Sequence, residues 1–354
     1  MISEYNSRKI KSLSFVCAMM VAAMHWCLTC EVRAVGSLDW WVQELVSQNF
    51  TRIAVPSFFV VSGYFVCNGF PDKVSVASIG DWWWKNLRKR LVSLGIPYVF
   101  WCAAGLVLHG MYLEFVTGEG AWLEFGSPRW WWRVFGPHPK YAFQLWFVKS
   151  LMEYVAISPL LVLAAKRIPV LWLGALFLAS LLIDAPYTIL QGVFFFSAGM
   201  AMRFHGKGLM ERMPFNRLGR FLPLALVFLW VVAVVSKIWL HTIGRTAVLG
   251  WVDIYGLHLN FMFAINVIGV AAVWTVYDCI KLPKMPSGGF FLFCMHVTVL
   301  PWAGWVVSRI PFVCDKVPLE YIIGVPFLIG VCMATRSLLA KFVPRFFGLV
   351  SGGR

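Results

Sequence analysis

Ten apolar runs, most of them close to the length that crosses a lipid bilayer, constrain this chain more than any other feature. A spanning helix needs about 20 mostly apolar residues, because each residue advances a helix by ~1.5 Å. Only 13% of the 354 residues are charged and 60% are hydrophobic, whereas soluble domains average about 25% charged residues. The sequence therefore predicts an all-α, polytopic membrane protein with about ten transmembrane helices.

Charged loops and Pro/Gly clusters separate the runs. The expected spans are residues 11–30, 51–70, 91–109, 143–164, 168–184, 186–203, 219–240, 255–277, 287–309 and 320–341. No soluble domain is expected between them, so residues 1–354 are treated as a single transmembrane domain. The first run is too long for the core of a signal peptide and lacks a small-residue cleavage site, so we expect it to remain as the first span.

Basic residues predict the orientation of the chain, because cytoplasmic loops of membrane proteins are enriched in lysine and arginine. With the N-terminus in the cytoplasm, most of the 31 basic residues fall on the inner side, and the charge alternates loop by loop. An odd number of spans would spoil that alternation, so both termini are expected to be cytoplasmic. The bilayer is the expected surrounding of the protein, and no nucleic-acid partner is expected.

His25 is an imidazole inside the first apolar run, roughly 20 Å above the cytoplasmic start of its span. An ionisable group within a membrane helix is costly and marks a functional site by default. Arg52 enters the second span from the outer side at a similar level, where Glu31 is a candidate partner. His296 lies near mid-depth in the ninth span and has two open interpretations, a functional residue or an interhelical hydrogen-bond strut.

Three further groups of side chains each have two interpretations. Lys149 and Glu153 are spaced i, i+4 on one helix face, and a buried structural pair is the favoured interpretation. The stretch 85–90, KNLRKR, is either an anionic-lipid anchor or a site for a phosphate-rich ligand. The tryptophans at 130–132 form either an interfacial belt or a stacking platform for sugar rings.

Several motifs resemble those of the integral membrane acyltransferase family 3, whose members add acyl groups, often acetyl, to hydroxyls of surface sugars and other exported acceptors. Residues 50–65, FTRIAVPSFFVVSGYF, resemble the family's second span. Residues 89–101, KRLVSLGIPYVFW, look like the basic start of the third span, and residues 144–151, QLWFVKSL, are similar to the fourth. Residues 194–200 and 290–296 match the sixth and ninth spans more loosely. Any one motif is weak, but the ordered set is fairly specific.

The resemblance implies roles for individual residues. His25 occupies the position of the first-span histidine thought to act in catalysis, and we expect it to be the general base that takes the proton of the acceptor hydroxyl. Arg52 or Ser62 is expected to orient the acceptor or to stabilise the tetrahedral oxyanion. Two positions depart from the family pattern: Ser14 replaces a frequent arginine, and Gln144 replaces a frequent histidine.

Lys11 or Arg8 is a candidate replacement for the arginine that is missing at position 14. The R-x-x-R pattern before the third span is only approximated by Lys85 and Arg88. These departures leave the expected fold intact and affect the details of the site.

Acetyl-CoA is the expected acyl donor, and the residues expected to bind its phosphates are Lys85, Arg88 and Arg90. The expected acceptor is a hydroxyl of a cell-surface glycan or of a lipid-linked sugar. The side chains expected to bind the acceptor are Trp131, Trp146, Glu153 and His296. No metal is expected. Modification of a surface glycan suggests a bacterial inner membrane as the location of the enzyme.

A transporter or flippase for a lipid-linked sugar or another polar solute is the alternative function. Ten spans, proline-interrupted helices and charges within the membrane suit a transporter equally well, although the weak internal repeat that would favour it is not found. The two functions differ in one requirement, because only the enzyme consumes an acyl-CoA.

Overall fold

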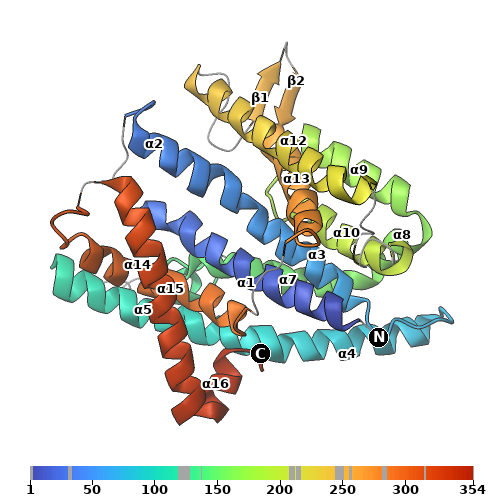
Figure 1. Cartoon of the computed structure of the whole chain (residues 1–354). Coiled ribbons are helices and arrows are strands. Elements are labelled where there is room, and N and C mark those ends of the chain that lie inside the picture. The colour runs from blue at the N-terminus through green and yellow to red at the C-terminus, as the bar shows by residue number, and fades with distance from the viewer. Residues whose placement is uncertain are drawn as a thin grey trace. The chain divides into compact units, whose positions relative to one another are not determined.

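Helices account for nearly all secondary structure in the computed structural model of the chain (Figure 1). The structure describes residues 3–30, 34–118, 128–136, 138–206, 212, 217–243, 251–254, 257–280, 285–314 and 316–353. Among these residues the only sheet is an antiparallel hairpin of β1 (Trp251–Ile254) and β2 (Leu257–Asn260), with Trp251 opposite Asn260. An all-α fold was expected, because helices satisfy their own backbone hydrogen bonds in lipid.

The chain divides into two compact units, and α1 (Glu4–Trp26) contributes to both. Unit 1 comprises residues 1–17, 44–86 and 154–286, and unit 2 comprises residues 18–43, 87–153 and 287–354. Short 3-10 and π helices are labelled η. Besides its part of α1, unit 1 contains both strands and the following helices: η2 (Glu44–Asn49), η3 (Phe50–Ile53), α3 (Ala54–Val66), most of α4 (Val76–Arg90), α8 (Ser158–Arg167), α9 (Pro169–Leu182), α10 (Gln191–His205), α12 (Arg217–Thr242) and α13 (Phe261–Val276). Unit 2 contains η1 (Cys27–Thr29), α2 (Leu38–Gln43), η4 (Leu91–Gly95), α5 (Ile96–Tyr112), η5 (Leu113–Thr117), α6 (Trp130–Phe135), η7 (Phe143–Leu145), most of α7 (Trp146–Ala156), α14 (Gly289–Val307), α15 (Val317–Phe342) and α16 (Pro344–Val350).

Close packing of α3 against α10 forms the centre of unit 1. A Cβ atom added at Gly63 would lie 1.9 Å from the carbonyl oxygen of Phe196, and one added at Gly199 would lie 1.9 Å from that of Val60. Small residues let membrane helices approach this closely. The glycines in the second-span and sixth-span motifs therefore have a packing role.

The centre of unit 2 is α14, which packs on α5 and α15. Two indoles join these helices to neighbouring backbone: Trp101 donates to the carbonyl of Val350 at 3.0 Å, and Trp302 donates to that of Leu108 at 3.0 Å. A third tryptophan, Trp26 at the end of α1, is fully buried against Gly324 of α15. This packing holds the last turns of α1 on the two C-terminal spans.

Five described helical segments are long and apolar enough to cross a membrane: Glu4–Thr29, Val76–Thr117, Phe221–Thr242, Gly289–Val307 and Val317–Phe342. A sixth forms if α7 and α8 count as one broken span, because they meet at a 70° bend. Each of the remaining expected spans contains a shorter helix, such as the 14-residue α9 and the 16-residue α13. The total of ten spans and the side of each terminus stay predictions.

Candidate active site

Two histidines meet in unit 2. His25 lies in the last turn of α1 and His296 lies in the middle of α14, and His25 Nδ1 is 2.8 Å from His296 Nε2. Their rings are nearly parallel, with an interplanar angle of 6°. His296 is fully buried, whereas His25 is half-buried. The two expected site histidines therefore form one pair, in which His25 is the accessible member.

A backbone carbonyl fixes the proton positions in this pair. His296 Nδ1 lies 2.7 Å from the carbonyl oxygen of Phe293. A carbonyl oxygen can only accept, so His296 carries a proton on Nδ1 and, when neutral, accepts at Nε2. His25 must then donate from Nδ1, which leaves the lone pair of a neutral His25 on Nε2. The hydrogen-bond network thus assigns both tautomers.

Phe143 and Gln144 in η7 border the histidine pair. The Phe143 and His25 rings are nearly perpendicular, with centroids 5.0 Å apart. Gln144 is buried and donates from Nε2 to the carbonyl of Cys294, at 2.7 Å, on the same helix as His296. Its Oε1 has no hydrogen-bond partner among the described residues. Gln144 thus combines a buried, unsatisfied acceptor with a hydrogen bond to the helix that carries His296.

Arg52 and Ser62, the other expected catalytic residues, belong to unit 1. Arg52 lies in η3, where Nε donates to the carbonyl of Ser47 at 3.1 Å and the guanidinium also binds the Gln48 side chain. Ser62 is a half-buried residue of α3. The expected Arg52 partner, Glu31, lies outside the described residues. The roles of Arg52 and Ser62 stay predictions.

The expected phosphate-binding residues all lie in the last turns of α4. Lys85 and Arg88, spaced i, i+3 on one face, are exposed, and Arg90 is half-buried. No described carboxylate forms an ion pair with any of the three. Their positive charges are thus available for an anion. The three residues lie inside the continuous helical segment Val76–Thr117 and not at a helix N-terminus, so free N-terminal amides do not add to these charges.

The expected acceptor-binding residues other than His296 are spread over unit 2. Trp131 in α6 is 54% exposed, and Trp146 at the start of α7 is half-buried. Glu153 forms the expected ion pair with Lys149. Their side chains are 50% and 32% exposed, so the interpretation of a buried pair was wrong. Consecutive turns of α7 place both side chains on the protein surface.

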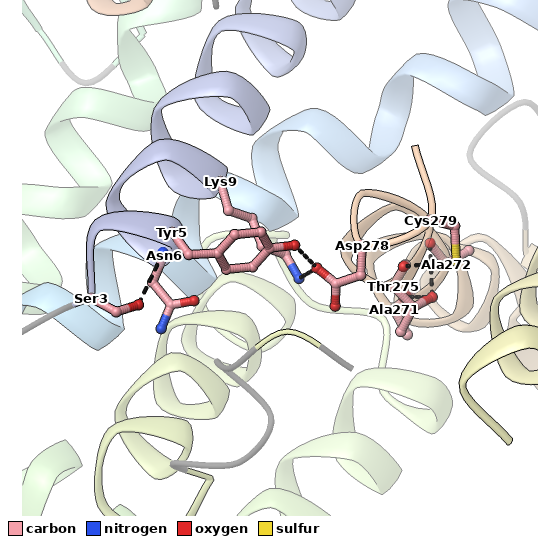
Figure 2. A network of polar contacts seen from close by, with 9 residues as sticks. All are labelled: Ser3, Tyr5, Asn6, Lys9, Ala271, Ala272, Thr275, Asp278 and Cys279. Atoms are coloured by element: carbon pink, nitrogen blue, oxygen red, sulfur yellow. Dashed lines mark hydrogen bonds and ion pairs between the residues drawn. The ribbon is translucent and has the colours of Figure 1, made fainter. Parts of the chain in front are cut away.

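A buried ionic group that the sequence analysis did not find connects α1 to the residues just after α13 in unit 1. Figure 2 shows the Tyr5 hydroxyl and the Lys9 ammonium converging on Asp278. Both groups donate to Asp278 Oδ1, Tyr5 at 2.5 Å and Lys9 at 2.6 Å. Lys9 is fully buried, and its ammonium lies 4.5 Å from the centre of the Trp274 ring. Lys9 and Asp278 are 269 positions apart, so the only signal in the sequence was an acidic residue placed beyond an apolar run.

Position 14, where Ser14 replaces the arginine that is frequent in the family, also lies in α1. Ser14 lines a small apolar cavity of about 20 Å³ together with Cys17, Ser57 and Trp274. Arg8 forms an exposed pair with Glu4 at 2.8 Å, and Lys11 is exposed. The buried cation of these turns is Lys9, five residues before Ser14, and it is held by Asp278.

Comparison with known families matches residues 10–257 to the acyltransferase domain of acyltransferase family 3. The match spans more than half of the chain and, with the apolar helices, shows that this integral membrane protein belongs to that acyltransferase family. His25 lies within the matched residues, and His296 lies beyond them.

Among individual proteins, the chain is similar to the succinoglycan biosynthesis protein ExoH of Rhizobium meliloti (strain 1021). The two are 26% identical over 348 residues, which cover 90% of this chain and 84% of that protein. No solved structure matches the chain.

Proposed function

We propose that this protein is a membrane O-acyltransferase that moves an acyl group, with acetyl as the expected one, from acyl-CoA to a hydroxyl of a glycan. The observation that carries the proposal is the His25–His296 pair, in which one imidazole is accessible and the other is buried and fixed by a carbonyl. Similarity to a protein of succinoglycan biosynthesis supports a polysaccharide or its lipid-linked precursor as acceptor.

His25 acts in this proposal as general base. Its Nε2 lone pair takes the proton of the acceptor hydroxyl while the hydroxyl oxygen attacks the thioester carbonyl carbon. The tetrahedral intermediate then collapses with cleavage of the C–S bond, and the His25 imidazolium returns the proton to the leaving thiolate. The products are the O-acylated glycan and free coenzyme A, so atoms and charge balance.

His296 acts as a positioning residue. By accepting the Nδ1 proton of His25 at 2.8 Å, it keeps Nε2 as the basic nitrogen and holds the orientation of the ring. The same hydrogen bond strengthens when His25 becomes positively charged, because a charged donor makes the stronger bond. The carboxylate of a serine-protease triad has an analogous role, here taken by a neutral imidazole.

Gln144 is proposed to contact the acceptor. Its Oε1 is buried without a partner among the described residues, while Nε2 is held by Cys294. A sugar hydroxyl is a donor of matching polarity, and a buried acceptor left without one costs about 1–3 kcal/mol. The acceptor would thus satisfy an atom that the protein leaves unsatisfied.

Lys85, Arg88 and Arg90 are proposed to bind the donor through the phosphates of coenzyme A. Their charges have no described acidic partner, and charge-assisted hydrogen bonds to phosphate are about twice as strong as neutral ones. Arg52 and Ser62 keep their proposed roles toward the acceptor or the oxyanion, and Trp131, Trp146 and Glu153 remain proposed glycan contacts.

Turnover of acetyl-CoA by the purified, full-length protein in detergent tests the function. Thiol release is followed with cell-envelope glycan as acceptor, for the wild type, for His25→Ala and for the control His205→Ala. His205 is an exposed residue of α10 that binds the Lys166 carbonyl. Loss of the base is expected to lower turnover by about 10²- to 10⁴-fold, whereas the control keeps its rate.

Two outcomes would contradict the proposed mechanism or the proposed function. Near wild-type turnover by a folded His25→Ala protein contradicts the general-base role. No thiol release from any protein, together with no binding of radiolabelled acetyl-CoA, contradicts the enzyme and supports a transporter of a lipid-linked sugar.

A further inference from the structure

A groove in unit 1 lies between the three helices α1, α3 and α13, and the proposed mechanism does not use it. It holds the cavity of about 20 Å³ that Ser14 lines, and we call it the Ser14 groove. Most of its lining side chains are half-buried rather than buried, so the groove opens at the protein surface. Its walls include Ser14 and Cys17 of α1, Ser57 and Val61 of α3, and Val273 and Trp274 of α13.

The lining of the groove is mostly hydrocarbon. Its few polar side-chain atoms are small groups, and one of them is already used, because Ser57 Oγ donates to the Ile53 carbonyl at 2.8 Å. A cavity that offers a water molecule so few polar partners takes up apolar groups instead. One wall is α1, which belongs to the candidate membrane span Glu4–Thr29. A hydrocarbon chain from the surrounding bilayer therefore suits the groove better than a polar ligand does.

Small side chains keep the groove open and narrow. Ser14 and Cys17 are spaced i, i+3 on one face of α1, and Ser57 faces the same cavity from α3. About 10–15 Å³ of such space holds one water molecule, so a cavity of about 20 Å³ admits a narrow chain and not a ring system. The shape thus favours a single acyl chain as occupant.

The Lys9–Asp278 ion pair marks one end of the groove (Figure 2). On α1, Lys9 comes five residues before Ser14, and on the other wall Trp274 comes four residues before Asp278. The Lys9 ammonium lies 4.5 Å from the centre of the Trp274 ring, so both helices reach the pair at the same end. The pair compensates its own charges and leaves the selection of a ligand to its neighbours.

Two further cations lie toward this end. Lys11 is exposed and shares a face of α1 with Ser14, three residues later. Arg203 of α10 lies over the Tyr64 ring, 5.4 Å from its centre, and Tyr64 packs with Val61 of the groove wall. Neither Lys11 nor Arg203 forms an ion pair with a described carboxylate. This end of the groove therefore complements a negatively charged group.

We propose that the Ser14 groove binds one acyl chain of an anionic phospholipid, whose headgroup lies at the end that carries Lys11 and Arg203. The chain fills the apolar groove, and the two cations select the headgroup. Each lysine or arginine near the membrane surface favours an anionic lipid by about fivefold, so two give about 25-fold. A zwitterionic lipid with the same chains gains no such preference. The proposal does not depend on acyl transfer by the histidine pair.

Photolabelling of the full-length protein in detergent micelles tests the site. The probe is phosphatidylglycerol with a diazirine in the middle of one acyl chain, and mass spectrometry identifies the labelled peptides. Saturable labelling is expected in residues 13–17, 57–61 and 270–274. Unlabelled phosphatidylglycerol is expected to compete about 25-fold better than phosphatidylcholine with the same chains. Glycerol 3-phosphate, which has a phosphate and no chain, is not expected to compete.

Two kinds of variant separate the groove from the charges. Ser14→Leu fills the groove and is expected to lower its labelling, whichever phospholipid is the competitor. The double change Lys11→Gln and Arg203→Gln is expected to remove the preference for phosphatidylglycerol and to leave competition by phosphatidylcholine unchanged. The matched controls Ser337→Leu and Lys341→Gln alter exposed positions of α15 in unit 2 and are expected to respond as the wild type does.

Equal competition by the two phospholipids overturns the proposal, as does an absence of label from the groove peptides, because either result indicates ordinary contact with the bilayer. Competition by glycerol 3-phosphate also overturns it and assigns the cations to a free phosphate. If the double variant does not fold, Lys11→Gln alone decides, since a preference that does not fall by about fivefold contradicts selection by charge. Thiol release is not measured, so these outcomes are independent of the proposed enzyme activity.

Discussion

The tautomer of His25 depends on a single atom of another residue, His296 Nε2, which accepts the Nδ1 proton at 2.8 Å. His296 is in turn fixed by the Phe293 carbonyl. Without that acceptor, either nitrogen of His25 can carry the proton, and a rotated ring aims the wrong nitrogen at the acceptor hydroxyl. The proposed function of His25 as a base therefore depends on a residue that does not itself touch the reacting atoms.

Replacing His296 by alanine is expected to lower the kcat of acyl transfer by about tenfold, since loss of a hydrogen bond worth ~1.4 kcal/mol in the transition state is a factor of ten in rate. The KM of the donor is expected to stay unchanged. The pH–rate profile is expected to change on its acidic limb, because His296 contacts the base. His296→Gln, which offers an amide oxygen as acceptor, should recover part of the rate. A profile identical to that of the wild type assigns His296 to packing alone.

Single residues were predictable where membrane physics makes them conspicuous. His25 and His296 stand out because each is an ionisable group inside an apolar run, and they proved to be hydrogen-bonded to each other. Lys9 was counted only as one of many inner-side basic residues, because its partner Asp278 is 269 positions away and no local pattern connects them. Lys237 likewise reads as an ordinary charge near a span end until its burial is seen.

At the scale of elements, the glycines of α3 and α10 are explained by helix contact. Gly63→Ala is expected to destabilise the protein by about 1–3 kcal/mol, because its Cβ would overlap the Phe196 carbonyl and force the helices apart. Gly174→Ala in α9 is the matched control, since nothing lies within 4 Å of its added Cβ. The control is expected to gain about 0.5–1 kcal/mol, because glycine is a poor residue in a helix. Equal effects of the two changes on thermal unfolding would contradict the packing role of Gly63.

The group formed by Tyr5, Lys9 and Asp278 fastens α1 to the end of α13 (Figure 2). Lys9→Met is expected to lower the free energy of unfolding by about 3–5 kcal/mol, because it breaks the buried ion pair with Asp278 by removing one of its two charges. Adding Asp278→Leu should recover most of that loss, since an apolar pair needs no compensation. Arg8→Met, which removes an exposed pair, is expected to cost at most about 1 kcal/mol. A double variant no more stable than Lys9→Met alone would show that the two residues act independently.

Helix positions were largely predictable from hydropathy, and their breaks were not. All ten apolar runs contain a helix. The period and length of an apolar run can be read from the sequence without knowing what the run packs against. The 70° bend between α7 and α8 occurs at Ile157, two residues before Pro159, whose ring excludes a regular turn there. A proline alone does not predict such a bend, since Pro301 and Pro326 lie inside continuous helices.

For the whole molecule, charge distribution remains the basis for the orientation. The basic turns of α4 precede the apolar residues of α5 in one helical segment, Val76–Thr117. Such a transition from charged to apolar residues is expected where a span leaves the cytoplasmic surface, because lysine and arginine near the ends of spans are retained on that side. If Lys85, Arg88 and Arg90 bind coenzyme A, the donor also approaches from the cytoplasm, where it is made.

Fusions to the two termini test this orientation together with the even number of spans. A fluorescent protein that folds only in the cytoplasm is expected to be bright at either terminus. An alkaline phosphatase that is active only outside is expected to work when inserted after Thr117, at the end of the segment that begins with α4. Opposite sides for the two termini would require an odd number of spans and would end the charge alternation. A phosphatase inactive after Thr117 would place Trp131 on the cytoplasmic side, away from an exported glycan, and so contradict its proposed role as a sugar contact while leaving the histidine pair untouched.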